Sequence, residues 1–132
     1  MSRRIFALLV IVLLVLGGAA HAQETGAPEG LRVVETLPSD GAVDVPTDGI
    51  ITVIFNRPVV PLTAIEARDS LPDALRIDPA TPGNGEWLNS AIYTFEGDPA
   101  LAANTTYTVS LNPELAAVDG AQVEPFSFSF TT

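Results

Sequence analysis

Apolar and polar residues alternate along several short stretches of this chain, with the two-residue period of a β-strand that buries one face. In one stretch Tyr107, Val109 and Leu111 alternate with threonine and serine. In another, close to the end of the sequence, three phenylalanines alternate with serine and threonine: Phe126, Phe128 and Phe130. Each stretch therefore predicts a strand whose apolar side chains, Phe128 among them, enter a core.

The spacing of Leu101 and Tyr107 predicts how one strand is joined to the strand before it. A leucine placed six residues ahead of a tyrosine that opens a strand is typical of the tyrosine corner of Greek-key sandwiches. There the tyrosine ring enters the core and its hydroxyl bonds to the backbone a few residues upstream. We expect Leu101 and Tyr107 to take these structural roles.

Other strands are predicted where apolar runs end at proline or glycine. Residues 50–55 are rich in β-branched side chains, are apolar on both faces and end at Phe55, so they predict a central strand. Residues 79–85 hold two prolines and two glycines and are expected to form a loop, with Trp87 at its edge. The remaining expected strands are residues 31–36, 75–78 and 91–96, with residues 43–45 as a short edge piece.

One stretch lacks the two-residue period. Thr63 and Glu66 have the spacing of a capping box, in which a threonine caps the start of a helix and an acidic residue three positions later bonds back to it. One or two helical turns are expected from Thr63 to Leu71, before Pro72. About seven short strands, regular turn residues and one short helical turn predict an all-β fold, an antiparallel β-sandwich.

The N-terminus has the three-part layout of a secretory signal peptide. Two arginines precede an apolar run over residues 5–16, and small residues around Ala22 provide a cleavage site. The run is short for a membrane span, and retention as an uncleaved anchor is the alternative. We expect residues 1–22 to be a signal peptide, residues 23–30 a flexible leader and residues 31–132 one domain, secreted or held in the periplasm or cell envelope.

Charge and composition restrict the partners of this domain. Beyond Ala22 the chain has four arginines, no lysine and all 16 acidic residues, a net charge of −12. Such a surface repels nucleic acid and anionic lipid, so neither nucleic acid nor a membrane is an expected partner after cleavage. There is no cysteine, so stability has to come from the core, for which about 110 residues are sufficient.

The side chains that perform most enzyme chemistry are missing. The only histidine, His21, lies in the predicted signal peptide, and the domain also lacks cysteine and lysine. This composition excludes Ser-His-Asp and Cys-His catalysis, zinc sites built from sulfur and imidazole, and Schiff-base chemistry. No glycine-rich phosphate loop is present. We therefore predict no catalytic residue and no cofactor, and the chain is not expected to be an enzyme.

Two sets of residues are weaker candidates for ligand binding. Asp40, Asp44 and Asp48 recur every four residues around two predicted turns. Their oxygen atoms suit calcium, although each also has a local reason as a turn former. Trp87 could stack on a sugar if exposed, although a tryptophan in a sandwich usually belongs to the core. A carbohydrate- or calcium-binding surface module is thus the alternative to a protein-contact module.

Several motifs, taken in their order along the chain, resemble the bacterial Ig-like domains of surface-layer proteins, the SbsA type. They are a Pro-x-Asp-Gly turn, an apolar strand ending in Phe before a Pro-Val step, a Leu-to-Tyr-x-Val corner, an Asp-Gly crossover turn and a closing Phe-Ser-Phe-Thr-Thr. Here they lie at residues 38–41, 50–59, 101–109, 119–120 and 128–132. The resemblance implies an Ig-like sandwich over nearly all of the mature chain.

Residues 55–62 and 85–89 are also similar to the N-terminal region of bacterial alpha-2-macroglobulins, exported protease-trapping proteins in which such a domain precedes many others. The bait segment and the Cys-Gln thioester of those inhibitors have no counterpart here, so the resemblance implies a structural module and no inhibitory residue. We expect a non-catalytic module that contacts neighbouring domains or an extracellular protein, as the N-terminal domain or a fragment of a larger secreted or envelope protein.

Overall fold

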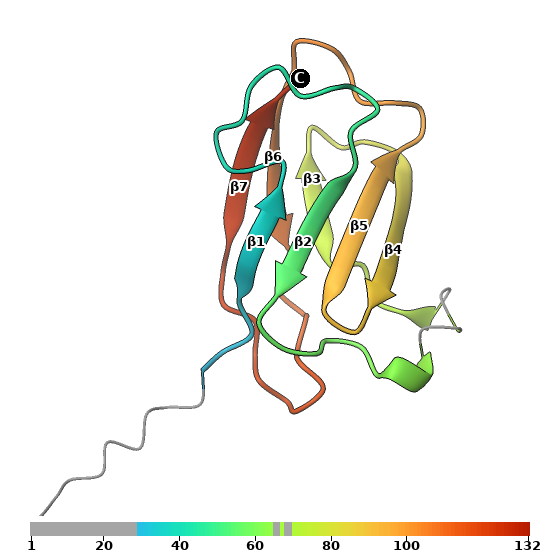
Figure 1. Cartoon of the computed structure of the whole chain (residues 1–132), viewed down its shortest axis with the longest axis vertical. Helices are drawn as coiled ribbons and strands as arrows, with labels where there is room; N and C mark the ends of the chain where they lie inside the picture. Colours follow the sequence, from blue (N-terminus) through green and yellow to red (C-terminus); the bar gives the residue numbers. More distant parts are fainter. Residues whose placement is uncertain (1–28, 65–66, 68–69) are drawn as a thin grey trace, which may run out of the picture.

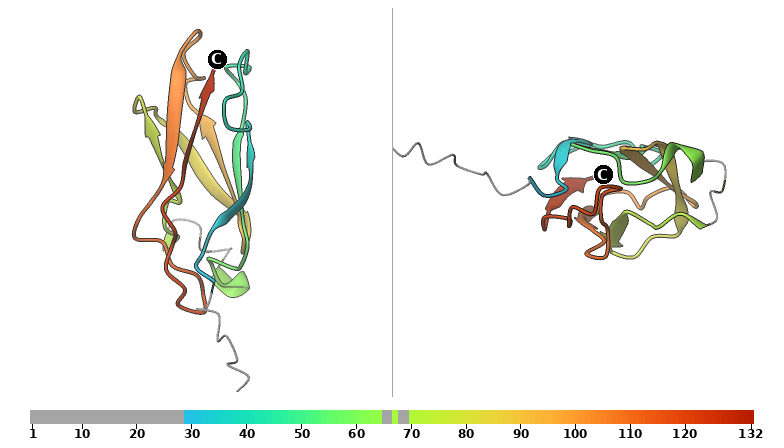
Figure 2. Two further views of the ribbon diagram at one scale, coloured as in Figure 1. Left: turned by 90° about the vertical axis from the view of Figure 1, so that its left-hand side faces the viewer. Right: turned by 90° about the horizontal axis from the view of Figure 1, so that it is seen from below.

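The computed structural model describes residues 29–64, 67 and 70–132, which form two antiparallel β-sheets packed face to face (Figure 1 and Figure 2). The strands in this part of the chain are β1 (Val33–Leu37), β2 (Ile51–Phe55), β3 (Leu75–Asp78), β4 (Gly83–Asn89), β5 (Ile92–Gly97), β6 (Thr106–Leu111) and β7 (Ser127–Thr131). The expected signal peptide, residues 1–22, and residues 23–28 of the expected leader lie outside the described residues.

The order of the strands identifies the type of sandwich. One sheet has the order β1-β2-β5-β4 and the other has the order β3-β6-β7. This is the arrangement of a seven-stranded, constant-type immunoglobulin sandwich. The predictions of an all-β sandwich with about seven strands, and of a central strand at residues 50–55, are confirmed, because β2 lies between β1 and β5.

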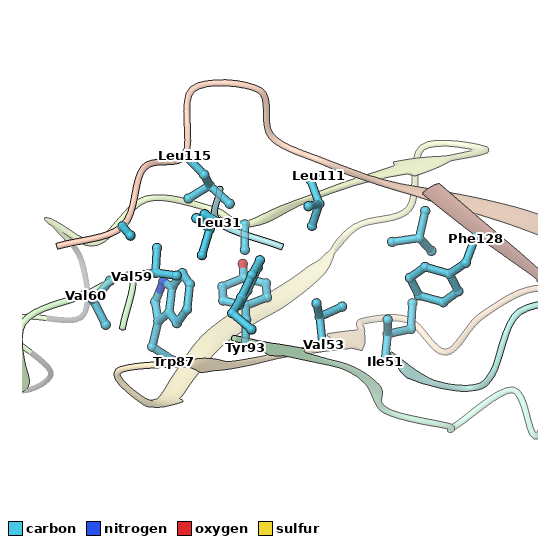
Figure 3. Close-up of a cluster of buried hydrophobic side chains, with 14 of the residues drawn as sticks. Leu31, Ile51, Val53, Val59, Val60, Trp87, Tyr93, Leu111, Leu115 and Phe128 are labelled. Carbon is cyan, nitrogen blue, oxygen red and sulfur yellow. The ribbon is translucent and has the colours of Figure 1, made fainter. Parts of the chain in front are cut away.

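The core lies between the inner faces of the two sheets. Along β2, Ile51, Val53 and Phe55 are buried and alternate with half-buried residues, as the two-residue period predicts. The opposite sheet contributes buried residues of β6 and β7: Tyr107, Val109, Leu111, Phe128 and Phe130. Figure 3 shows Ile51 and Phe128 at one end of this layer and Trp87 with Val59 and Val60 at the other. The core includes Phe55 and Phe128, as expected.

Phe126 departs from the predicted alternation. The sequence pattern predicts that it points inward with Phe128 and Phe130, but its side chain is 37% exposed. The regular pairing of β7 with β6 begins only at Ser127, one residue after Phe126. The ring of Phe126 therefore lies at the surface, 6.1 Å from that of Phe128.

The predicted C-terminal boundary of the loop at residues 79–85 is wrong, because strand β4 already begins at Gly83. Gly83 and Gly85 lie opposite β5, and a Cβ atom at Gly85 would overlap the Tyr93 hydroxyl, while one at Gly83 would overlap the Phe95 ring. The aromatic side chains of β5 thus pack over the backbone of β4 at the two glycine positions, where β4 has no side chain. The two glycines make room for aromatic rings and do not form a turn.

The expected short helical turn is present in the described residues, but the threonine does not cap it as predicted. A 3-10 turn, η1, spans Leu62–Ala64, and Thr63 lies inside it instead of capping it from outside. Residues 65–66 and 68–69 of the predicted span lie outside the described residues. Within the described part of the chain, no helix is long and apolar enough to cross a membrane.

The expected edge piece at residues 43–45 is only partly right. Pairing with the outer side of β7 is made by Gly41, Ala42 and Val45, through hydrogen bonds to Ser129 and Thr131. Ala42 lies parallel to Phe130, whereas Val43 is 70% exposed. The chain that follows β1 therefore crosses to the other sheet and covers the edge of β7.

Candidate interaction surfaces

Tyr107 makes the contacts of a tyrosine corner. Its ring is buried and stacks on Phe130, with 5.6 Å between the ring centroids. Its hydroxyl oxygen accepts a hydrogen bond of 2.8 Å from the backbone N–H of Ala102. Leu101 is buried beside it, and Asn104 turns the chain with a φ of 49°. The corner is a structural device that fixes the loop before β6.

Replacing Tyr107 with phenylalanine should lower the free energy of unfolding by about 1–3 kcal/mol, because the partly buried N–H of Ala102 loses its acceptor. Urea titration followed by circular dichroism measures this loss. Thr108→Ala, on the outer face of the same strand, is the control and should cost under about 0.5 kcal/mol. Equal midpoints for the wild type and Tyr107→Phe would contradict the role of the hydroxyl.

Trp87 is a core residue and is not available for sugar stacking. Its side chain is 3% exposed, and its indole Nε1–H donates a 3.0 Å hydrogen bond to the carbonyl oxygen of Pro72. Its ring centroid lies 5.9 Å from that of Phe55 and 5.1 Å from that of Tyr93. The aromatic cluster of Trp87, Phe55 and Tyr93 therefore closes one end of the core.

Of the three aspartates proposed for calcium, Asp40 and Asp44 have separate structural roles. Asp40 Oδ1 accepts a 2.9 Å hydrogen bond from the backbone N–H of Ser129. Asp44 adopts a φ of 54°, a left-handed conformation that aspartate tolerates better than most residues. Among the described residues, no three acidic, histidine or cysteine side chains are grouped so that they could hold a metal ion. The structure thus does not bring Asp40, Asp44 and Asp48 together as a site.

Two of the surface hollows in the described part of the chain lie over the sheets. One, of about 500 Å³, is mainly apolar and contains one arginine; it is lined by Arg76, Ser110, Leu111, Pro113, Val123, Pro125, Phe126 and Ser127. The other, of about 420 Å³, lies over β4 and β5 and is lined by Ile50, Asn84, Gly85, Glu86, Leu88, Thr94 and Glu96. Glu86 is half-buried and Glu96 is exposed, so the second hollow has an acidic lining.

An ion pair ties the end of β2 to the crossover between β6 and β7. Arg57 Nη1 lies 2.9 Å from Asp119 Oδ2. The hydrogen bond from the N–H of Ala121, together with Arg57, lowers the pKa of the Asp119 carboxyl. Since the Asp119 side chain is largely exposed, water screens this pair, and it serves to position the crossover.

Tyr93 is the ionisable member of the aromatic cluster, and its side chain is buried. Its hydroxyl donates a 3.2 Å hydrogen bond to Asp73 Oδ1. Burial raises the pKa of Tyr93 above the ordinary value of 10.0, and the negative charge of Asp73 raises it further. The neutral phenol is therefore the form that the fold stabilises.

Stability should fall in alkaline solution because of Tyr93. In the unfolded chain this phenol loses its proton near pH 10, whereas in the folded chain it keeps it, so its contribution is complete below pH 10 and is lost above it. The loss should steepen toward about 1.4 kcal/mol per pH unit as the phenol of the unfolded chain becomes fully deprotonated above pH 10. Urea midpoints between pH 8 and pH 11 should decline less for Tyr93→Phe; equal declines would contradict this.

The strand order, the tyrosine corner and an aromatic core to which both sheets contribute define the chain as an Ig-like β-sandwich. Its sequence matches the bacterial Ig-like domain family over residues 27–132, and the chain belongs to that family. No curated protein sequence matches it. The resemblance to bacterial Ig-like domains drawn from the motif order is confirmed at this level.

Solved structures of longer proteins share the fold. They include an L,D-transpeptidase from Mycobacterium smegmatis (24% identity, TM-score 0.53), L,D-transpeptidase 3 from Mycobacterium tuberculosis (22%, 0.51) and the surface layer protein SbsC, domains 1–6 (19%, 0.53). The matches cover 79%, 76% and 80% of this chain, but only 40%, 37% and 14% of those structures. At such identities the likeness shows the fold alone.

Proposed function

We propose that the chain is a non-catalytic, exported Ig-like module that connects or spaces other domains of a larger secreted or envelope protein. The observation that carries the proposal is the path of the chain through the sandwich. The described chain starts beneath β1, and Thr132 lies at the opposite end of the long axis (Figure 1). A sandwich entered at one end and left at the other suits modules joined end to end.

Three further features support this role. The domain lacks the histidine, cysteine and lysine on which most nucleophilic and acid–base catalysis relies. Its charge of −12 favours solubility and disfavours nucleic acid and anionic lipid as partners. The structures that share its fold are longer chains, of which the sandwich is a minor part. The partner would then be a protein, either a neighbouring domain or an extracellular protein.

More narrowly, we propose that the larger protein is of the bacterial alpha-2-macroglobulin kind, with this module near its N-terminus. The support is the sequence similarity of residues 55–62 and 85–89. These two segments lie at the same end of the sandwich, where Val59, Val60 and Trp87 are buried. The similarity thus concerns how the module is built, and it carries no inhibitory residue.

Export is tested by expressing the chain with its own N-terminus in a bacterial host and measuring the intact mass of the product in each cell fraction. We expect a soluble product outside the cytoplasm that begins at Gln23. A product of the full 13.8 kDa retained in the membrane fraction would contradict cleavage and favour an anchor.

Membership of a larger protein is tested in the source organism. Antibodies raised against the purified module should detect, in the envelope or secreted fraction, a protein far larger than 13.8 kDa. A reactive band at the mass of the processed module, and none above it, would contradict the connecting role.

A further inference from the structure

Each sheet has two edges, and an unpaired edge strand can recruit another strand through its free N–H and C=O groups. Three of the four edges carry features that discourage such pairing. β7 is covered by residues 41–45. β3 has only four residues, includes the charged Arg76 and Asp78 and is followed by Pro79. β1 has a bulge between Val33 and Glu35.

β4 is the exception. It is the longest strand in the described part of the chain, with seven residues, and it forms the outer edge of the four-stranded sheet (Figure 1). It has no proline and one charged residue, Glu86. Its bulge lies at the far end, between Trp87 and Asn89. The stretch from Gly83 to Glu86 therefore presents a regular edge.

The hydrogen-bond phase shows which backbone groups face outward. The N–H of Asp98 donates to the carbonyl oxygen of Pro82, at the start of the ladder between β4 and β5. Opposed residues in an antiparallel ladder alternate between bonded and non-bonded pairs, so Asn84 and Glu86 bond to β5, while the N–H and C=O groups of Gly83 and Gly85 point away from it. In the described residues, no hydrogen bond from outside this strand pair reaches those groups.

The surface beside this edge indicates what chemistry would fit there. The hollow over β4 and β5 combines two carboxylates, Glu86 and Glu96, with the apolar side chains of Ile50 and Leu88, which are 52% and 57% exposed. Among the described residues that line this hollow, none is cationic. A second copy of the chain would bring the same acidic face and a charge of −12 against it, which disfavours self-pairing.

We propose that the edge of β4 binds an extended, positively charged segment of a partner protein by β-strand addition. Main-chain hydrogen bonds to Gly83 and Gly85 hold the added strand in place. Side-chain contacts on one face determine which partner is bound. A lysine or arginine lies opposite Glu86, and an apolar residue two positions away lies over Leu88. This deepens the proposed protein-contact role and rests on it, since it names the partner's chemistry.

The test uses the processed, full exported chain labelled with ¹⁵N and the synthetic peptide acetyl-Thr-Val-Thr-Lys-Thr-Val-Thr-amide. Two further peptides carry N-methyl groups on alternate residues, one on the odd-numbered and the other on the even-numbered positions, which gives the two N-methyl phases. A fourth peptide has glutamate in place of lysine. Glu86→Lys is compared with Glu35→Lys, which makes the same charge change on exposed β1. Chemical-shift titration and amide hydrogen exchange are recorded for each combination.

We expect the unmodified peptide to shift the amides of β4 and to slow exchange at Gly83 and Gly85 at least tenfold. Only one N-methyl phase should weaken binding by about tenfold or more, because only one set of peptide N–H groups faces β4. The glutamate peptide and Glu86→Lys should each weaken it similarly, whereas Glu35→Lys should not.

Three results would overturn the proposal. They are slow exchange at Gly83 and Gly85 in the free protein, equal binding by both N-methyl phases, and concentration-dependent shifts at β4 without peptide, which would mean that a second copy occupies the edge. None of them alters the fraction in which the protein is found or the size of the native protein, so the connecting role is tested separately.

Discussion

Phe128→Ala is expected to lower the free energy of unfolding by about 3–5 kcal/mol. The Phe128 side chain is 3% exposed and belongs to the inner face of β7, beside Val109 of β6. Replacement by alanine would delete the buried ring and leave a cavity between the two sheets. The cavity would persist because the hydrogen bonds between strands hold the backbones in place. Urea titration by circular dichroism gives the loss directly.

The control for this prediction is Phe126→Ala, two positions earlier in the same aromatic series. Because that ring is 37% exposed and precedes the strand, its loss should cost less than about 1 kcal/mol. Similar large losses for both variants would mean that both rings are buried, as the simple alternation predicts. A loss below about 1 kcal/mol for Phe128→Ala would mean that β7 is not placed as described.

Trp87→Ala should be comparably costly, at about 3–5 kcal/mol. The change removes the ring that packs against Phe55 and Tyr93, and it leaves the carbonyl oxygen of Pro72 without the indole donor. Unfolding is followed by circular dichroism, since the variant retains no tryptophan.

Leu88→Ala is the matched control for Trp87, because this neighbouring side chain points outward and is 57% exposed. It should change the free energy of unfolding by less than about 0.5–1 kcal/mol. If Trp87→Ala were as mild as Leu88→Ala, the tryptophan would be a surface residue, and its use in stacking on a ligand would have to be reconsidered.

The parts of the fold that could be predicted depend on local patterns. The alternation in β2 and β6 specifies which side chains are buried, because the strand period is two regardless of what the strand pairs with. The tyrosine corner is also local, since the Tyr107 hydroxyl and its partner, the N–H of Ala102, are five residues apart. A strand, a turn and the contact between them are then contained in one short stretch.

β4 could not be predicted from local patterns, because the role of its glycines depends on another strand. Gly83 and Gly85 look like turn residues until the rings of Tyr93 and Phe95 are seen to occupy the space of their missing side chains. The one available signal is that Gly83, Gly85 and Trp87 are spaced by two. Phe126 departs from the prediction for a related reason, since alternation in a sequence does not show where a sheet ends.

The candidate surfaces were less predictable than the fold. A turn-forming role follows from residue type for both Asp40 and Asp44; Asp44 has the left-handed backbone of such a residue, whereas Asp40 bonds to the distant N–H of Ser129. The open edge of β4 depends instead on which segments cover the other three edges. That information is distributed over β1, β3, β7 and residues 41–45, so no single stretch of sequence contains it.

The core described above makes this chain a self-supporting Ig-like sandwich that needs neither a metal ion nor a disulfide. This property is tested most directly by guanidinium unfolding of the processed chain, followed in parallel by far-ultraviolet circular dichroism and by the fluorescence of Trp87, with calcium and with chelator. We expect a β-rich spectrum and one transition, with the same midpoint for both probes and both conditions. A helical spectrum, separate transitions for the two probes, or a midpoint that rises with calcium would contradict this expectation.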